Sequence, residues 1–342
     1  MDQPRTFSSW LIIAVLVVAA IGLPFVVPTY YVQFATKALI MGLLAMALNL
    51  AVGHGGLVSL CHAAFFGVAG YMLAILTPKY DPASLWLTLP VAVGTAAFVA
   101  LVIGALALRT RGVYFIMVTL AFGEMLFYLF HDTKIAGGSD GAYVNTKPEV
   151  AIAGYQLLNL EKPIVFYLVV LACLIGTVAL IDMLVRSPFG RALAAARDNE
   201  RRARSLGFPI FRVRLTAFVI SGALAGVAGY FAAAQFGFVA PQMLGWHQSA
   251  TVLVMVLLGG LRSVAGPLVG AIVLMGLEEV LKATTVYWKL VEGLIVVIIV
   301  LALPNGVRQL LTLTFGEPAQ DKPAAHAVPA TTKQPVTEAG HG

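Results

Sequence analysis

The chain has 342 residues, of which 60% are hydrophobic and 11% are charged, and its formal net charge is +6. A soluble domain of this composition would expose large apolar patches and aggregate, so the composition excludes a soluble protein and predicts one solvated mainly by lipid. Cys61 and Cys173 lie inside apolar runs without the spacing of a disulfide framework or a metal site, so we interpret both as buried apolar residues.

Apolar runs along the chain predict an all-α protein that crosses the membrane many times. The hydrocarbon core of a bilayer requires about 20 predominantly apolar residues per helix, and roughly 17 to 25 are tolerated. The eighth and tenth of the runs below are short, which indicates broken or partly crossing helices. Ten runs meet or approach the required length, at residues 10–27, 34–52, 57–76, 85–108, 113–130, 164–185, 215–236, 247–260, 264–281 and 290–303.

The runs divide the chain into three parts. Residues 1–9 precede the membrane and residues 10–305 form the membrane domain. Residues 306–342 are rich in Pro, Ala and Thr with scattered charge, so we expect a disordered tail that buries no core. The first run has no small-residue cleavage site before Pro24, and we interpret it as a retained helix rather than a cleaved signal peptide.

The arginines predict the orientation of the chain. If the N-terminus lies inside and the chain crosses ten times, all thirteen arginines fall on one face. Short loops retain Lys and Arg in the cytoplasm, so this face and both termini are predicted to be cytoplasmic. The segments 131–162 and 237–246 then lie outside. Two sets of five helices would be antiparallel to each other, so a 5+5 inverted repeat is a further hypothesis.

The segment 48–71, LNLAVGHGGLVSLCHAAFFGVAGY, is predicted to interrupt a helix within the membrane. Each of its glycines at 53, 55 and 56 lowers helix stability by about 1 kcal/mol relative to alanine. Non-helical backbone persists at membrane depth only where protein or a water-filled cavity covers it. The polar residues here therefore either line a path through the membrane or satisfy freed backbone groups. The candidates for the path are Asn49, His54, Ser59, His62, Phe65 and Phe66.

Ionisable side chains inside the runs are rare, because a centrally placed charge costs roughly 2.5–3.5 kcal/mol to insert. Glu124, about two-thirds along the fifth run, is another candidate for lining the path. Pairing with a neighbouring helix and snorkelling to the outer surface are the open alternatives for this residue. Glu278, Glu279 and Glu292 lie near the outer ends of their runs, where ordinary interfacial solvation explains them.

Two pairs of glycines have the spacing of close helix contacts in lipid. Small residues four positions apart let two helix backbones approach each other. We favour packing inside the subunit over contact with a sister subunit. The pairs are Gly222 with Gly226 and Gly266 with Gly270.

The segment 186–214, RSPFGRALAAARDNERRARSLGFPIFRVR, carries eight arginines and two acidic residues, so its net charge equals that of the whole chain. Ser187 followed by Pro188 indicates a helix start. Gly207 followed by Pro209 indicates its end. Apolar residues between them share one face opposite the arginines, which predicts a short amphipathic helix. Such a helix would dock into a groove on a soluble partner or lie on anionic lipid headgroups, and charge alone leaves both open.

Three blocks of the sequence resemble one family. The blocks GRALAAARDNERRARSLGFPIFRVRLTAFVISGALAGVAG, LNLAVGHGGLVSLCHAAFFGVAGY and VLLGGLRSVAGPLVGA are similar to the LivM-type branched-chain amino acid permeases, and the resemblance covers residues 40–305. His62 to Phe66 resemble this M-type subunit rather than its H-type partner. His54 and Cys61 depart from the aromatic residue and the glycine that are frequent in the family. The resemblance implies a coupling helix seated in a cleft of an ATPase subunit, with coupling residues Arg197, Arg201, Ala203, Arg204, Leu206 and Gly207.

The resemblance implies a permease subunit of an ATP-binding-cassette importer in the bacterial inner membrane. Such a subunit moves branched-chain amino acids or related solutes inward by alternating access and is not an enzyme. The chain lacks GxxxxGK[ST], so it holds no cofactor of its own and ATP and Mg²⁺ belong to partner chains. The implied partners are a homologous H-type permease, two ATPase subunits, a periplasmic substrate-binding protein and the lipid bilayer, with no nucleic acid.

Two alternatives remain beside this function. A permease of the same family for urea, short amides or aromatic acids would carry the same sequence pattern. A secondary transporter or channel independent of ATP would need a coupling-ion site or a charged filter, which the sparse intramembrane acids do not favour. An intramembrane enzyme would need a motif such as HExxH or GxSxG, or a facing carboxylate pair, and none of these lies at a plausible membrane depth.

Overall fold

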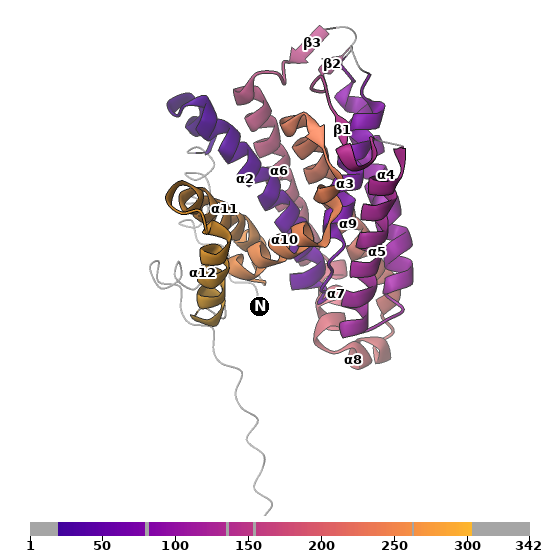
Figure 1. Ribbon diagram of the computed structural model, residues 1–342. Helices are drawn as coiled ribbons and strands as arrows, with labels where there is room; N and C mark the ends of the chain where they lie inside the picture. The colour runs from indigo at the N-terminus through magenta and orange to yellow at the C-terminus, as the bar shows by residue number, and fades with distance from the viewer. Residues whose placement is uncertain (1–19, 79–81, 135–136, 153–154, 262, 303–342) are drawn as a thin grey trace, which may run out of the picture.

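The computed structural model describes residues 20–78, 82–134, 137–152, 155–261 and 263–302 (Figure 1). Apart from four short strands, the regular structure in these ranges is helical, which confirms the expected all-α class. The α-helices are α2 (Thr29–Asn49), α3 (His62–Leu76), α4 (Leu85–Ala107), α5 (Val113–Asp132), α6 (Pro163–Arg186), α7 (Pro188–Asp198), α8 (Glu200–Ser205), α9 (Ile210–Phe236), α10 (Trp246–Gly259), α11 (Gly266–Thr284) and α12 (Trp288–Ala302).

Five helical segments of the described residues are long and apolar enough to cross a bilayer. They are Thr29–His54, Leu85–Ala107, Val113–Asp132, Pro163–Arg186 and Ile210–Phe236, and they coincide with five of the ten expected runs. The third and eighth runs contain the shorter apolar helices α3 and α10. The last two runs contain α11 and α12. Most of the first run, together with residues 1–9 and 306–342, lies outside the described residues.

Helix α9 forms the centre of the bundle, where it packs against α2, α3 and α4. Phe218, Tyr230 and Phe231 of α9 are fully buried. Helix α4 presents a column of buried alanines to α9, at the spacing that lets two helices approach closely in lipid. A Cβ atom at Gly222 or Gly226 would overlap an alanine methyl group of α4. These two glycines therefore serve packing within the subunit.

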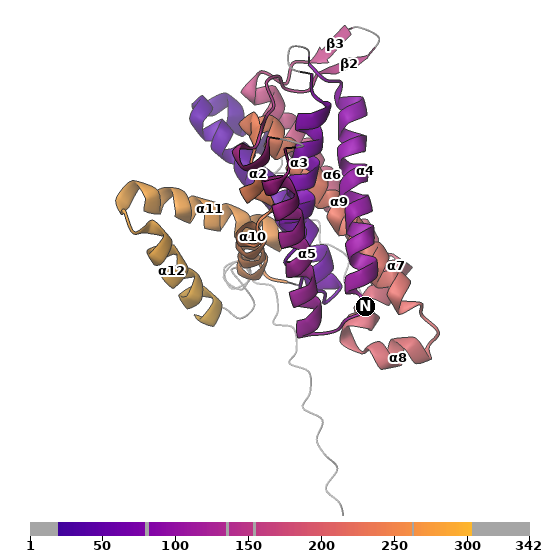
Figure 2. The ribbon, with the colours of Figure 1, turned by 45° about the vertical axis from the view of Figure 1, so that its right-hand side comes forward.

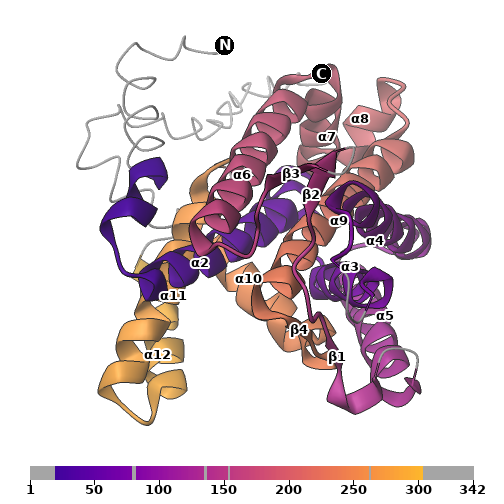
Figure 3. The same cartoon turned by 90° about the horizontal axis from the view of Figure 1, so that it is seen from above.

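The second glycine pair lies where α10 and α11 meet. A Cβ atom at Gly266 would overlap the backbone of Gly259, and one at Gly270 would overlap the carbonyl oxygen of Met255. The two helices thus contact each other backbone to backbone. The hairpin of α11 and α12 projects from the side of the bundle (Figures 2 and 3). The outer face of α12 carries exposed apolar side chains, including Leu290, Leu294 and Leu301.

The two ends of the bundle differ in structure (Figure 1). One end carries the strands: β1 (Ala142–Tyr143) pairs antiparallel with β4 (Phe238–Val239), and β2 (Val150–Ile152) pairs antiparallel with β3 (Tyr155–Leu158). The short 3₁₀ turns η3 (Gly138–Asp140) and η4 (Pro241–Leu244) adjoin these strands. The β1–β4 pair joins the segments 131–162 and 237–246, which the sequence places on one face.

The opposite end carries α7 and α8 and all ten arginines of the described residues. These arginines lie in the α4–α5 turn, at the end of α6, in α7 and α8, and in the first turns of α9. We call this the arginine end and the other the strand end. The separation agrees with the expectation that the arginines gather on one face.

Two expectations about element boundaries were wrong. The third run was expected to be helical from residue 57, whereas α3 begins at His62 because the chain turns at Gly56 with a φ of +67°. The segment 187–207 was expected to form one amphipathic helix. It forms α7 and α8, which are separated at Asn199 by extended backbone, and the Asn199 side chain accepts a hydrogen bond from the Arg202 N–H at 3.0 Å. Leu206, expected on the apolar face of that helix, follows the end of α8 and is 68% exposed.

Candidate coupling and translocation site

The backbone between α2 and α3 breaks regular helix inside the bundle. Helix α2 continues directly into one π-helical turn, η1 (Leu50–His54), and residues 55–61 follow without helix. Single π-helical turns occur frequently at functional sites. A Cβ atom at Gly53 would overlap the carbonyl oxygen of Leu261, from the α10–α11 connection. The predicted interruption is therefore present, and glycine is required where η1 meets a second backbone segment.

Asn49 fastens this break to the α10–α11 connection. Its side chain is buried, and Nδ2 donates a hydrogen bond to the carbonyl oxygen of Ser263 at 2.8 Å. The carbonyl oxygen of Asn49 itself lies 3.4 Å from Nδ1 of His54. The side-chain oxygen Oδ1 of Asn49 is buried and has no hydrogen-bond partner among the described residues. A buried acceptor without a partner destabilises a fold, so the break holds one unsatisfied polar group at its centre.

His62 cross-links three elements through its two ring nitrogens. Nε2 lies 2.7 Å from Oγ of Ser221 on α9, and Nδ1 lies 3.1 Å from Oγ of Ser59. Ser221 Oγ donates its only proton to the carbonyl oxygen of Ala47 at 2.5 Å, so it must accept from an Nε2–H. In the neutral ring, Nδ1 then accepts from Ser59 Oγ. The network thus selects one tautomer and joins α2, α3 and α9.

The aromatic candidates lie in the same packed core. Phe65 is fully buried and Phe66 is 3% exposed. The rings of His62, Phe65 and Phe218 meet edge to face, with centroid distances of 5.4 to 5.7 Å. Offset and edge-to-face geometries are the favourable ones for aromatic pairs. His62, Phe65 and Phe66 thus pack between helices, and whether they also line a path stays a prediction.

Glu124 contacts the start of a helix. Its Oε1 accepts a hydrogen bond from the backbone N–H of Trp246, the first residue of α10, at 3.1 Å. The first N–H groups of a helix have no partner within the helix and carry partial positive charge, so a carboxylate stabilises this end. Glu124 thereby ties α5 to α10, which corresponds to the pairing with a neighbouring helix left open by the sequence.

Arg197 of α7 points into the bundle and contacts the break. Its Nη1 donates a hydrogen bond to the carbonyl oxygen of Gly53 at 2.7 Å, and its Nε pairs with Asp198 at 2.9 Å. The Cγ atom would lie 2.7 Å from a Cβ atom at Gly56, so the side-chain stem also fills the space above that glycine. One residue of the arginine-rich segment therefore touches η1 directly.

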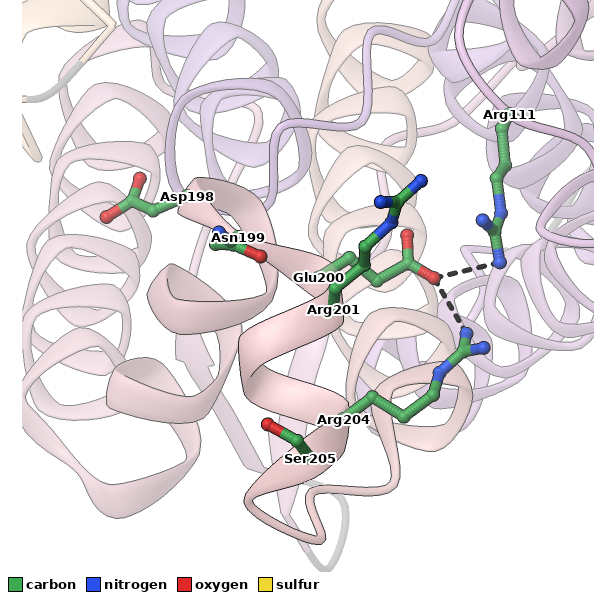
Figure 4. A pocket seen from close by; sticks show the side chains of 7 residues that line it. All are labelled: Arg111, Asp198, Asn199, Glu200, Arg201, Arg204 and Ser205. Carbon is green, nitrogen blue, oxygen red and sulfur yellow. Dashed lines mark hydrogen bonds and ion pairs between the residues drawn. The ribbon is translucent and has the colours of Figure 1, made fainter. Parts of the chain in front are cut away.

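Glu200 gathers three guanidinium groups at the arginine end, those of Arg111, Arg204 and Arg214. Figure 4 shows the pairs with Arg111 and Arg204. The Glu200 Oε1 lies 3.0 Å from Nη2 of Arg111 and 2.7 Å from Nη2 of Arg204, and its Oε2 lies 3.0 Å from Nη1 of Arg214. Arg214 also donates to the carbonyl oxygen of Ala196 at 2.9 Å. The carboxylate thus connects α8 to the α4–α5 turn and to α9, and Arg214 adds a bond to the end of α7. We call these four charged residues the Glu200 cluster.

The remaining coupling candidates divide into buried and exposed groups. Ala203 is 1% exposed and packs against the bundle. Arg201, Leu206 and Gly207 are exposed, and Gly207 has a φ of +82°, which glycine adopts without strain. Beside them a cavity of about 660 Å³ opens, lined by Glu200, Arg201 and neighbouring residues (Figure 4). The exposed rim of α8 is thus the part of the segment that is free to meet another molecule.

Sequence reasoning missed the partners of these residues. Arg111 and Arg214 were noted only as parts of a cationic face, because their contact with Glu200 depends on tertiary packing. Ser221 had no signal at all, since a serine in an apolar helix is common. Lys37 had a usable signal, because a lysine inside an apolar run is rare.

These features define a multi-pass membrane subunit with an interrupted helix at its centre and an arginine-rich segment bonded to it. The family described as "Branched-chain amino acid transport system / permease component" matches residues 30–301. The chain therefore belongs to this family of branched-chain amino acid transport permeases, and it is a transport subunit rather than an enzyme. The LivM-type resemblance of the sequence is confirmed.

The relatives agree with the family. The chain is 34% identical over 321 residues to the high-affinity branched-chain amino acid transport system permease protein LivM of Escherichia coli, which covers 88% of this chain and 75% of that protein. The LivM protein of Salmonella typhimurium is 33% identical over the same shares. The L-arabinose ABC transporter permease protein AraH of Azospirillum brasilense is 25% identical over 253 residues, 72% of this chain and 66% of that protein. No solved structure matches the chain.

Proposed function

We propose that this chain is the permease subunit of an importer that moves branched-chain amino acids, or related small solutes, from the periplasm to the cytoplasm by alternating access. In this proposal ATP and Mg²⁺ are bound by two separate ATPase subunits, and a homologous H-type permease completes the membrane unit. The arginine end faces the cytoplasm together with both termini, following the positive-inside rule. The observation that carries the mechanism is the bond from Arg197 to Gly53.

Coupling would pass from α8 through α7 to the interrupted helix. The exposed rim of α8 meets the ATPase, and the Glu200 cluster makes α8 move together with the α4–α5 turn and α9. Arg197 then carries the movement of α7 to the carbonyl oxygen of Gly53 at the break. Docking on an ATPase is favoured over lipid headgroups, because the guanidinium groups of Arg111, Arg204 and Arg214 are already paired with a carboxylate of the chain itself.

The strand end would receive the substrate-binding protein. The β1–β4 pair brings the two outer segments into one surface, and Tyr143 on it is 73% exposed. The Tyr143 ring lies against Phe238 with the centroids 5.0 Å apart. An exposed tyrosine held by an aromatic neighbour is a frequent anchor in protein interfaces. The bundle between this surface and the arginine end would then contain the route of the solute.

Reconstitution tests this function. The chain, its H-type partner and the ATPase subunits are placed in proteoliposomes with ATP on the cytoplasmic side and the binding protein on the other. We expect uptake of radiolabelled leucine that requires ATP and the binding protein, and that is absent with an ATPase subunit unable to hydrolyse ATP. Uptake by the chain without the ATPases would establish a secondary transporter or channel instead. Uptake of urea or an aromatic acid in place of leucine would assign the alternative substrate within the same family.

A further inference from the structure

A second cavity, of about 290 Å³, lies between α2, α6, α9 and α11 toward the strand end. The starts of α2 and α6 and the ends of α9 and α11 form its walls, together with the loop that contains Lys147. Pockets for drug-sized ligands span roughly 300–1,000 Å³, so this cavity suits a smaller molecule. None of the path candidates expected from the sequence lines it.

Two lysines bring positive charge to this cavity. Lys37 lies about 12 Å along α2 from its first residue, at a rise of roughly 1.5 Å per residue. Among the described residues its ammonium group has no ion pair or hydrogen bond. A charged residue at membrane depth is costly, so its presence indicates a functional site. The Nζ atom of Lys147 lies 4.8 Å from the centroid of the Phe166 ring.

Burial acts on the Lys147 side chain in the outer loop. It lowers the pKa of this lysine, and the charge of Glu161 partly opposes that change. A partly desolvated ammonium interacts more strongly with an anion than one in bulk water does. The lining of the cavity therefore favours a carboxylate close to the two lysines.

Two oxygen acceptors belong to the same cavity. The carboxylate of Glu279 on α11 accepts a hydrogen bond from the hydroxyl of Tyr30. Gln235 on α9 donates from Nε2 to the carbonyl oxygen of Gln33 at 2.8 Å, and this bond aims its amide. Its Oε1 is buried and has no hydrogen-bond partner among the described residues. A ligand with a cationic donor would satisfy this orphaned acceptor.

Aromatic side chains supply the apolar part of the lining. Phe34, Phe166 and Phe236 come from three different helices, and Phe166 is 2% exposed. The cavity thus combines cations, oxygen acceptors and an apolar surface in a small volume. A neutral molecule such as urea would leave the cations and the carboxylate of the cavity without a charged partner. An amino acid with an apolar side chain offers a partner to the cations, to the oxygen acceptors and to the apolar surface.

We propose that this cavity binds the transported solute as a zwitterion with an apolar side chain. Lys37 and Lys147 face its carboxylate, Glu279 and Gln235 face its ammonium group, and the phenylalanines contact its side chain. This inference rests on the proposed function and adds to it a solute site within this subunit, separate from the binding protein. It also assigns a role to Glu279 beyond the interfacial solvation expected from the sequence.

The test measures protection of a cysteine by the solute in the assembled importer. Cys61 and Cys173 are replaced by alanine, and Gln33→Cys places a thiol at the exposed rim of the cavity. The native Gln33 contributes its backbone carbonyl oxygen to the bond with Gln235, and the substitution keeps that oxygen. The binding protein is omitted so that only the membrane unit binds leucine. With leucine at about ten times its half-protecting concentration, occupancy is about 90% and modification by a thiol reagent slows about tenfold. Modification of the control Ser139→Cys, exposed and outside the cavity, is unchanged.

The charges are tested in the same background. Glu279→Gln retains an acceptor for Tyr30, and Lys147→Gln lies in a loop, so at least one of them is expected to assemble. Loss of a charged partner raises the half-protecting leucine concentration about tenfold or more. Leucinamide, which lacks the carboxylate, and isocaproate, which lacks the ammonium group, protect about tenfold less well than leucine.

The outcomes separate this inference from the proposed function. If proteoliposomes take up leucine but leucine gives no protection, the cavity is not the site and the function stands. If no leucine is taken up at all, the proposed function fails. Protection that follows the phosphatidylethanolamine content of the bilayer rather than leucine would show a lipid headgroup site and overturn the inference.

Discussion

Replacing Arg197 by glutamine removes the contact that joins α7 to the interrupted helix. The side chain is 25% exposed, and its bond to the carbonyl oxygen of Gly53 is 2.7 Å long. A hydrogen bond from a charged donor contributes about 1.5–3 kcal/mol, whereas the pair with Asp198, whose carboxylate is 66% exposed, contributes little. A loss of about 2 kcal/mol shifts the equilibrium between the state in which α7 is bonded to η1 and the state in which they are separated roughly 30-fold toward the separated state.

This shift predicts uncoupling rather than loss of ATP hydrolysis. We expect Arg197→Gln to retain ATPase activity stimulated by the binding protein while the number of solute molecules imported per ATP falls several-fold. Arg197→Lys keeps the charge but loses the planar guanidinium group, so its import per ATP should lie between those of the native protein and Arg197→Gln. The assay measures uptake and phosphate release on the same proteoliposomes. Arg191→Gln, on the exposed face of α7, is the matched control and should leave the ratio unchanged. An unchanged ratio in Arg197→Gln would refute transmission through this bond.

Three further substitutions test the local structure. Gly56→Ala places a side chain against Arg197 at a φ of +67°, so it should destabilise the purified complex by about 1–2 kcal/mol and lower its thermal midpoint. Gly176→Ala, in open space within helix α6, should not lower the midpoint, because alanine favours helix over glycine. Glu200→Gln leaves three guanidinium groups without a counter-charge, so we expect weaker co-purification of the ATPase subunits; undiminished recovery of the full complex would argue against the cluster as a docking scaffold. His62→Phe removes both ring hydrogen bonds and should destabilise the protein by about 1–3 kcal/mol in thermal unfolding, while His62→Gln should recover part of that loss; equal stability of the two variants would contradict the assigned network.

The helix break and the charge distribution could be predicted from the sequence because their causes are local. The glycines of segment 48–71 disfavour helix in any tertiary context. The arginines gather on one face because short loops that carry Lys and Arg stay in the cytoplasm. The start of α7 at Ser187 followed the same local logic, and the Ser187 hydroxyl accepts from the Gly190 N–H at 3.3 Å. The break at Asn199 could also have been predicted from the sequence, because asparagine is strongly preferred at the N-cap of a helix.

The roles of the polar residues could not be predicted, because they depend on partners far along the chain. A histidine that lines a path and one that cross-links helices are equally polar at membrane depth. The partner of His62 on α9 is 159 residues away, and only packing reveals it. Lys37 and Glu279 lie in one cavity because α2 packs against α11, which no periodicity shows. The inverted repeat stays a prediction.

The π-helical turn η1 has a mechanical consequence for the centre of the subunit. One residue more than an α-helical turn is accommodated there, and each residue of an α-helix advances the side-chain direction by about 100°. If the π-helical turn moved one helical turn back along α2, the side chains between its old and new positions would rotate to another face of the helix. Both ends of the helix would stay in place. A rotation of this kind would reorient a few side chains at the centre of the membrane without displacing the surrounding helices.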